Sequence, residues 1–254
     1  MNLGIEYIKY QWKAKRRHGV HSPFIYDLTD KCFRIRISLE LKSNLSKLHA
    51  KLSKDIRSIE ISDFGAGSKK LNNTRTIRSI YNISSSRGKF GILLYQLVNH
   101  LSPERVLEFG TSMGIGAICM ASGNSNSKIT TVEGCSNTFA VANENIAETQ
   151  LDNIESVNST FNCYLDRLTN EVFDLIFIDG HHDGVALTNY LKRLEAHSHN
   201  ETIFILDDIR WNESMFQAWE TMKSDARYHV TIDLFRMGIV VPRKEQEKEH
   251  FVIR

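Results

Sequence analysis

Cysteine is scarce in this chain and never occurs in the close pairs that metal sites use. The 254 residues include four cysteines, and no two of them are spaced as CxxC. This spacing argues against a zinc site, and it gives no sign of the disulfide framework of a small secreted domain. Reduced thiols in a cytoplasmic protein are the simplest interpretation. The four residues are Cys32, Cys119, Cys135 and Cys163.

The chain also lacks a long apolar run. No segment approaches the ~18–20 apolar residues of a membrane-spanning helix. The first residues, MNLGIEYIKYQWKAKRR, contain no apolar core followed by a small-residue cleavage site, so they are not typical of a signal peptide. With 41% hydrophobic and 24% charged residues, the composition is that of a globular protein. We therefore expect a soluble, cytoplasmic chain without a transmembrane segment.

Charge is divided unevenly along the sequence. Residues 1–90 contain 19 Lys and Arg against 7 Asp and Glu, whereas residues 91–254 contain 13 against 23. Such an asymmetry indicates two parts with different tasks. We predict a basic, mainly helical N-terminal extension or substrate lid over 1–90, with helical patterns at Ile5–Arg16 and Ser38–Ile56. A second domain then covers residues 91–254.

From about residue 105, short apolar segments alternate with helical patterns. Repeated β-α units predict a mostly parallel sheet with helices on both faces. Two later segments, Tyr228–Leu234 and Arg236–Val241, predict an antiparallel hairpin. The tail Arg243–His250 has the pattern of a solvated charge run. The expected parallel strands are Arg105–Phe109, Lys128–Val132, Ile154–Val157, Phe173–Ile178 and Thr202–Leu206.

A glycine-rich turn follows the first of these strands. Gly110, Gly114 and Gly116 form a G-x3-G-x-G pattern directly after Glu108. Glycine lets the backbone approach a ligand closely, and a helix N-terminus offers unpaired N–H groups. A dinucleotide site uses G-x-G-x-x-G, and a carboxylate here would repel a pyrophosphate, but it suits a ligand with an ammonium and a sulfonium. Glu133 ends the next strand, where a carboxylate can accept hydrogen bonds from both hydroxyls of a ribose.

The run VLEFGTSMGIG resembles motif I of the class I S-adenosylmethionine (SAM) dependent methyltransferases, and ITTVEG resembles their next acidic loop. The resemblance implies a Rossmann-like sandwich with a mostly parallel, seven-stranded sheet and a C-terminal antiparallel hairpin. It also implies SAM as the cofactor. An incidental glycine turn and an NAD fold remain alternatives. The cofactor-binding residues expected on this basis are Glu108, Gly110, Thr111, Ser112, Gly114, Glu133, Phe161 and Asp179.

Carboxylates also follow two later strands. Asp179 comes after one of them, and Asp207 and Asp208 come after the next. Carboxylates that converge at one edge of a sheet repel each other unless a cation compensates them. An all-oxygen set is the ligand type of Mg²⁺, Mn²⁺ or Ca²⁺. We predict a divalent-metal site at these three residues, with contacts to SAM and substrate, or structural capping, as the alternatives.

The segments FIDGHHDG and LDDIRWN resemble the metal-dependent catechol and caffeoyl-CoA O-methyltransferases, in which an Asp and an Asp-Asn pair hold the cation. Asp208 stands in place of that Asn, as the cephalosporin-hydroxylase-like branch tolerates. The resemblance implies Asp179 and His182 as catalytic residues, with His182 as the base that deprotonates a hydroxyl. His181 could replace it, and a plain loop histidine is the other interpretation.

The basic residues near the N-terminus allow three interpretations. Lys9, Lys13 and Lys15 belong to a cluster that continues to residue 17 and precedes HGVHSPF. It can be a solvated helix face, a lid or self-association arm of a homodimer, or a surface for nucleic acid or an anionic membrane. A second glycine loop, DFGAGS at 63–68, predicts a local turn, or an anion loop with Lys69, Lys70 and Arg75.

These observations predict SAM-dependent O-methylation of a small hydroxylated or acidic molecule, assisted by a divalent metal. Alignment of the methyl group with the acceptor would supply most of the catalysis. The first alternative is methylation of RNA or protein gripped by the basic extension. The second is a SAM-binding adaptor without catalytic activity.

Overall fold

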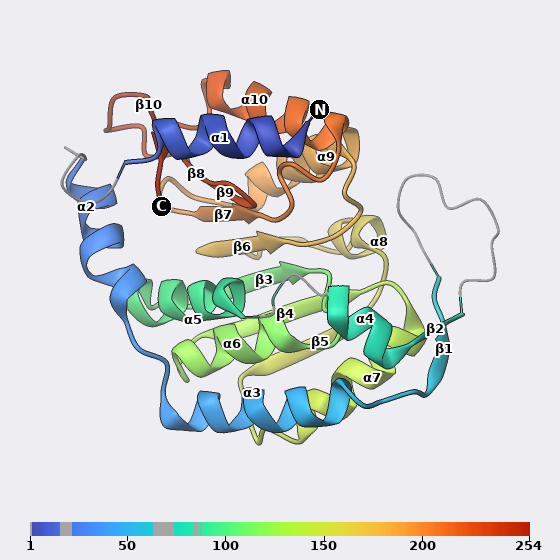
Figure 1. Ribbon diagram of the computed structural model, residues 1–254. Helices are drawn as coiled ribbons and strands as arrows, with labels where there is room; N and C mark the ends of the chain where they lie inside the picture. Colours follow the sequence, from blue (N-terminus) through green and yellow to red (C-terminus); the bar gives the residue numbers. More distant parts are fainter. Residues whose placement is uncertain (1, 16–21, 63–73, 84–85, 87) are drawn as a thin grey trace. The chain divides into compact units, whose positions relative to one another are not determined.

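The computed structural model describes residues 2–15, 22–62, 74–83, 86 and 88–254. They form two compact units, drawn in Figure 1. The central unit comprises Lys31–Arg167, and the terminal unit combines Met1–Asp30 with Leu168–Arg254. The DFGAGS segment, and residues 18–21 of HGVHSPF, lie outside the described residues.

The central unit is built on three parallel strands in the order β3-β4-β5. In β3 (Arg105–Phe109), Val106 lies opposite Ile129 of β4 (Lys128–Glu133), and Val132 of β4 lies opposite Val157 of β5 (Ile154–Asn158). The side chains of Val106, Leu107 and Phe109 are buried, as expected for a strand that is covered on both faces.

Helices surround these strands. α5 and α6 pack against each other so closely that a Cβ atom on Gly123 would lie 2.8 Å from the carbonyl oxygen of Tyr95. The helices of this unit are α3 (Leu39–Leu52), α4 (Ile77–Ile83), α5 (Lys89–Leu101), α6 (Ile115–Gly123), α7 (Ser136–Ala147), α8 (Phe161–Leu165) and the 3-10 helix Cys32–Arg34. A short ladder pairs β1 (Ser58–Glu60) antiparallel with β2 (Thr74–Thr76).

The terminal unit contains five described strands in the order β10-β8-β9-β7-β6. β6 (Leu175–Ile178) and β7 (Ile203–Leu206) are parallel and wholly buried. The hairpin of β8 (Val230–Leu234) and β9 (Met237–Val241) adds β9 antiparallel to β7. The helices are α1 (Leu3–Lys13), α2 (Pro23–Asp30), α9 (Gly184–Leu194), the 3-10 helix Glu195–His197 and α10 (Glu213–Ser224).

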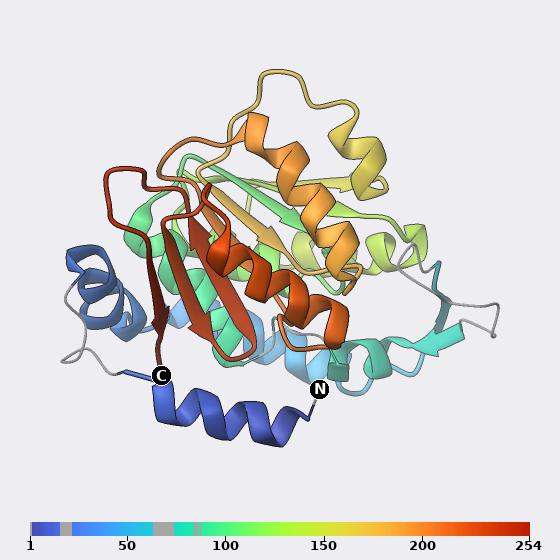
Figure 2. The same cartoon turned by 90° about the horizontal axis from the view of Figure 1, so that it is seen from above.

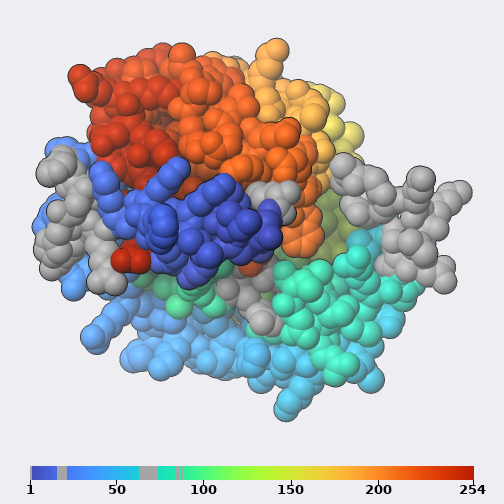
Figure 3. Space-filling model, turned by 45° about the horizontal axis from the view of Figure 1, so that its top comes forward, coloured from blue at the N-terminus to red at the C-terminus, as the bar shows by residue number. Residues whose placement is uncertain are grey.

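The end of the chain adds a strand that the sequence did not predict. Residues 243–250 are exposed or half-buried, as expected of a charge run, but the last two of them begin β10 (Glu249–Val252), which pairs parallel with β8 and buries Phe251. The C-terminus lies beside α1, as Figure 2 shows, and Tyr10 of α1 donates a hydrogen bond to the carbonyl oxygen of Ile253. α1 itself lies on the surface of this unit (Figure 3).

The predicted α/β fold, with parallel strands and a C-terminal antiparallel hairpin, is confirmed. Apart from the β1–β2 ladder, the described strands of the two units number three and five, one more than the seven expected, and the additional strand is β10. The N-terminal part is mainly helical, but the division at residue 90 stays a prediction. Among the described helices, none is long and apolar enough to cross a bilayer.

Gly238 in β9 gives a prediction about stability. A Cβ atom there would lie 2.5 Å from Cζ3 of Trp219, which is fully buried. Overpacking of this kind costs about 1–3 kcal/mol, so we expect Gly238→Ala to lower the free energy of unfolding by that amount in urea titrations.

The matched control is Gly4→Ala in α1, where the nearest atom to an added Cβ is 3.4 Å away. Alanine favours a helix over glycine by roughly 0.5–1 kcal/mol, so this variant should be neutral or more stable. Equal destabilisation by both changes would contradict the packing at Trp219.

Candidate functional site

The glycine loop of the central unit joins β3 to α6. Gly110 and Gly114 have φ angles of 100° and 82°, in the left-handed region that favours glycine. The loop closes with a hydrogen bond of 2.8 Å from the Gly114 N–H to the carbonyl oxygen of Thr111. A Cβ atom on Gly114 would also approach Ile146 to 3.2 Å. The conformation of this loop therefore depends on glycine at both positions.

Glu133, at the end of β4, anchors the glycine loop. Its Oε2 accepts a hydrogen bond of 3.0 Å from the Ser112 N–H, and its Oε1 accepts one of 2.9 Å from the Cys135 N–H. Burial raises the pKa of Glu133, and the backbone N–H groups oppose that rise. Each carboxylate oxygen can accept more than one hydrogen bond, so Glu133 can bind ligand hydroxyls while it holds the loop.

Glu108 lies inside the central unit. Only 1% of it is exposed, and a Cβ atom on Gly116 would lie 2.1 Å from its Oε1. Thr131 Oγ1 donates a hydrogen bond of 2.5 Å to Glu108 Oε2 and lies 2.6 Å from Thr111 Oγ1. Burial raises the pKa of Glu108 to about 8; the Thr131 hydrogen bond opposes the rise and the charge of Glu133 adds to it. Through these contacts Glu108 and Thr111 connect the glycine loop to β4. Contact of either residue with the cofactor stays a prediction.

Phe161 begins α8. Its ring stacks on Phe109 at the end of β3, with ring centroids 4.6 Å apart and planes 5° from parallel. Thr160 caps the helix by accepting a hydrogen bond of 3.2 Å from the Cys163 N–H. The stack holds the Phe161 ring against Phe109, the residue directly before the glycine loop, and contact of Phe161 with the cofactor stays a prediction.

Asn145 is a loop-supporting residue that was not predicted from the sequence. From α7, its buried amide donates a hydrogen bond of 3.0 Å to the carbonyl oxygen of Met113, inside the glycine loop. Lys51 of α3 in turn donates to Asn145 Oδ1 at 3.0 Å. The signal in the sequence is a polar residue at helical spacing from Val141 and Ala142, on the buried face of α7.

In the terminal unit, Asp207 and Asp208 follow β7 and contact one arginine. Arg236 Nε lies 3.4 Å from Asp207 Oδ1 and 2.9 Å from Asp208 Oδ1. The side chain of Asp207 is 0% exposed and that of Asp208 14% exposed. Burial raises the pKa of Asp208 and the charge of Asp207 adds to this, whereas Arg236 opposes it. The cation beside this acidic pair is therefore a side chain of the protein.

His182 is close to the same pair. Its Nε2 lies 3.9 Å from Asp208 Oδ2, and its ring is 5.4 Å from that of Trp211. The Asn212 amide donates a hydrogen bond of 2.8 Å to the His182 carbonyl oxygen and so fixes the loop after β6. His181, by contrast, stacks on Tyr190 of α9 and shares a hydrogen bond with its hydroxyl. The structure thus distinguishes the two neighbouring histidines.

The predicted metal ligands are not gathered into a metal-binding group. Among the described residues, no set of three or more His, Cys, Asp and Glu side chains is arranged to hold a metal ion. Asp207 Oδ1 is buried without a hydrogen-bond partner, which is the kind of oxygen a cation would take, but Arg236 Nε already lies 3.4 Å from it. With Arg236 in this position, the set Asp179, Asp207 and Asp208 does not fit a divalent ion.

Backbone strain concentrates in these loops. Eight described residues other than glycine have positive φ angles, and four of them follow β3, β6 or β7. Such conformations cost of order 1–3 kcal/mol each and persist where the surrounding structure enforces them, often at functional sites. The four residues are Ser112, His181, His182 and Asp208.

Comparison with known proteins gives one family match for this chain. Residues 107–209, a segment that spans the glycine loop and the acidic pair, match a family model described as a methyltransferase domain. No curated protein is similar enough in sequence to give a match.

Three solved structures show the same fold. A methyltransferase of Podospora anserina bound to S-adenosylhomocysteine (SAH) is 16% identical, with a TM-score of 0.60, over 87% of this chain and 96% of that one. An O-methyltransferase of Bacillus cereus with SAH is 19% identical, with a TM-score of 0.56, over 84% and 94%. A candidate caffeoyl-CoA O-methyltransferase of Staphylococcus aureus is 14% identical, with a TM-score of 0.57, over 65% and 88%. At these identities the likeness establishes the fold.

Glu108 generates a prediction about pH. Burial raises its pKa from the ordinary 4.5 to about 8, so the folded state binds the proton more tightly than the unfolded state. Its contribution to stability is complete below pH ~4.5 and is lost as the pH rises through about 8, by about 1.4 kcal/mol per pKa unit. We expect Glu108→Gln to flatten the fall in unfolding free energy across this range.

Glu155→Gln is the control, because Glu155 lies on the surface of β5 in an ion pair with Lys128. Urea titrations of the three proteins between pH 4.5 and 8 make the comparison. An unchanged slope in Glu108→Gln would show that Glu108 is charged in the folded protein.

Proposed function

We propose that this methyltransferase-domain protein transfers the methyl group of SAM to an oxygen of a small hydroxylated acceptor. The observation that carries the proposal is the glycine loop, which lies within the matched domain and is hydrogen-bonded to Glu133 through Ser112. The solved structures of the same fold include O-methyltransferases and proteins bound to SAH, the product that SAM leaves after methyl transfer.

The central unit would bind the cofactor. Gly110, Ser112 and Gly114 offer backbone groups to the methionine part of SAM, since glycine allows close approach. Glu133 would accept hydrogen bonds from the ribose hydroxyls, and Phe161 would contact the adenine ring. Asp179 stays a predicted contact of the cofactor.

His182 would act as the base that removes the acceptor's proton. Its imidazole can take a proton from a hydroxyl as the oxygen attacks the methyl carbon. When the proton has moved to His182, the charge of Asp208, 3.9 Å away, stabilises the imidazolium. The methyl group leaves the sulfonium of SAM with the bonding pair remaining on sulfur, which gives SAH.

Metal assistance, expected from the sequence, is not needed for any of these steps. A divalent ion would orient a hydroxyl and lower its pKa. The contacts of Arg236 with Asp207 and Asp208 do not favour an ion there, so the proposal assigns activation of the hydroxyl to protein side chains.

Cofactor binding tests the proposal first. Titration calorimetry of the full chain with SAM should show binding, and Gly114→Arg should abolish it, because a side chain there meets Ile146 and forces the loop out of the left-handed conformation. Gly4→Arg, in α1, is the control and should bind like the wild type. If the wild type binds no SAM, the proposed function is wrong.

The predicted base gives a second test. We expect His182→Gln to lower kcat for SAH formation by about 10²–10⁴-fold, the usual contribution of a general base, while the Kd for SAM stays unchanged. His199→Gln serves as the control, since His199 pairs with Asp174 on the surface. A kcat within a factor of about two of the wild type would remove His182 from the mechanism.

The two alternatives predict different results in the same assays. An RNA or protein substrate gripped by the basic N-terminal part would give turnover that falls steeply with salt, because counterions are released on binding. A non-catalytic SAM-binding adaptor would give no SAH with any acceptor. In the described part of the basic region, Lys9 pairs with Glu6 of the same helix, which is typical of a solvated face.

A further inference from the structure

We propose that Arg236 supplies the fixed cation of the acceptor site, in the place where the sequence led us to expect a divalent metal. The inference rests on the proposed function, because it concerns the place where the acceptor would bind. It goes further in naming the group that compensates the acidic pair there and in predicting a metal-independent enzyme.

The contacts of Arg236 provide the first argument. Besides its Nε contacts, Arg236 Nη2 lies 3.5 Å from both Asp207 Oδ2 and Asp208 Oδ2. One guanidinium therefore spans all four oxygens of the pair, as its planar, permanently charged fork allows. A Mg²⁺ ion lies about 2.0–2.1 Å from each of its ligand oxygens. The space between these carboxylates therefore cannot hold both Mg²⁺ and the guanidinium of Arg236.

The turn that carries Arg236 is fixed by hydrogen bonds. Phe235 and Arg236 connect β8 to β9, and Phe235 has a φ of 70°. The Phe235 N–H donates a hydrogen bond of 2.8 Å to Asp233 Oδ1, and the Arg236 carbonyl oxygen accepts one of 2.9 Å from the Ile209 N–H. The second bond ties the turn directly to the loop that contains Asp208.

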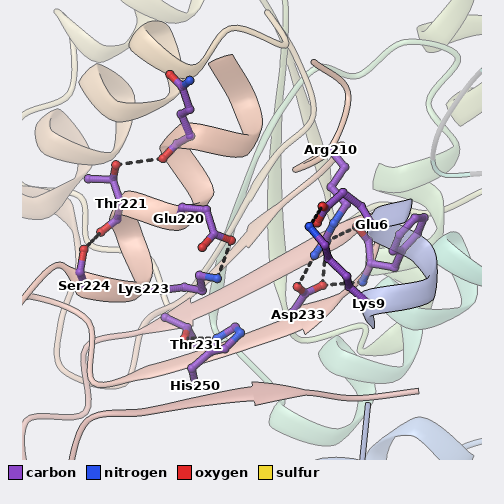
Figure 4. A network of polar contacts seen from close by, with 12 residues as sticks. Glu6, Lys9, Arg210, Glu220, Thr221, Lys223, Ser224, Thr231, Asp233 and His250 are labelled. Carbon is purple, nitrogen blue, oxygen red and sulfur yellow. Dashed lines mark hydrogen bonds and ion pairs between the residues drawn. The ribbon is translucent and has the colours of Figure 1, made fainter. Parts of the chain in front are cut away.

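A buried ion pair between Arg210 and Asp233 stabilises the same turn. Arg210 binds Asp233 through two hydrogen bonds of 2.9 and 2.6 Å, and the two side chains are 8% and 4% exposed (Figure 4). Arg210 also donates a hydrogen bond of 2.7 Å to the Phe235 carbonyl oxygen. A bidentate pair in a buried position resists rearrangement, because breaking it leaves an uncompensated charge.

Helix α1 completes the support. The rings of Tyr7 and Tyr10 contact the Phe235 ring, with centroid distances of 5.0 and 5.2 Å. Aromatic pairs at such distances contribute about 0.5–1.5 kcal/mol beyond the area they bury. The N-terminal helix therefore positions the turn of Arg236, which is a structural task that the basic composition of residues 1–90 does not suggest.

The charge balance indicates the class of acceptor. Two carboxylates and one guanidinium leave one net negative charge, whereas a divalent ion would leave none. A carboxylate acceptor would be repelled by this charge, whereas a neutral hydroxylated acceptor would not, and Asp208, whose side chain is 14% exposed, is the carboxylate of the pair that it would meet. Of the two acceptor types expected from the sequence, the hydroxylated one fits this site.

Binding of Mn²⁺ to the full-length protein, followed by electron paramagnetic resonance, tests the proposal without any acceptor. The wild type should bind no Mn²⁺ at the acidic pair. Arg236→Ala should uncover the pair and gain Mn²⁺ binding, with a Kd at least ~10-fold below the detection limit set by the wild type, and Asp207→Asn in the same variant should abolish that gain. Arg227→Ala is the matched control, because Arg227 also pairs with two carboxylates, those of Asp225 and Glu195, and its side chain is 36% exposed.

Two results would overturn the proposal. One is Mn²⁺ binding to the wild type that Asp207→Asn removes; the other is an Arg236→Ala variant that gives a native circular dichroism spectrum yet gains no Mn²⁺ binding. Arg236→Lys keeps the positive charge and should bind no Mn²⁺. This variant tests the role of the charge even if the alanine variant does not fold. SAM titrations on the same samples keep the outcome separate from that of the proposed function, since neither Arg236 nor Asp207 is among the predicted cofactor residues.

Discussion

The carboxylate of Glu133 connects the features on which the candidate cofactor site depends. It accepts hydrogen bonds from the backbone of Ser112, in the glycine loop, and of Cys135, at the start of α7. The adjacent strands β3 and β4 bring these segments together, and Asn145 binds the glycine loop from α7. The loop is therefore shaped before any ligand arrives, and preorganisation of this kind lowers the cost of binding.

The acidic pair of the terminal unit depends on a different constraint, which is the compensation of two neighbouring carboxylates. Asp207 is fully buried, and a buried carboxylate needs a partner of opposite charge. Arg236 supplies that charge from the β8–β9 turn, and Asp233, Arg210 and the α1 tyrosines hold the turn in place. The terminal unit thus combines the two ends of the chain around one arginine.

Local features of the sequence predicted much of this structure. The glycine spacing, the buried strands and the acidic residues at their ends follow from short-range patterns, and the strands lie within a few residues of their expected bounds. The site details that escaped prediction all depend on pairings between distant residues. Arg236 reaches Asp207 across 29 positions, and β10 finds β8 after a charged turn.

Glu108 illustrates the same limit. An acidic residue before a glycine loop indicates a ligand contact. The direction of the Glu108 side chain, however, depends on Gly116 of α6, because the absence of a side chain there leaves room for the Glu108 carboxyl group. Asn145 is the converse case, a polar residue on a buried helix face whose partner, the Met113 carbonyl oxygen, becomes evident only in three dimensions. Periodicity places such residues on a face, whereas their partners come from tertiary packing.

The most direct test of the account is the affinity for SAM of Glu133→Ala, compared with Glu155→Ala on the neighbouring strand. Removing Glu133 deletes the anchor of the glycine loop and the proposed partner of the ribose. Hydrogen bonds to a charged group contribute about 1.5–3 kcal/mol, so the Kd for SAM should rise by roughly 10- to 100-fold in Glu133→Ala and stay unchanged in Glu155→Ala. A folded Glu133→Ala protein that binds SAM as tightly as the wild type would contradict the account.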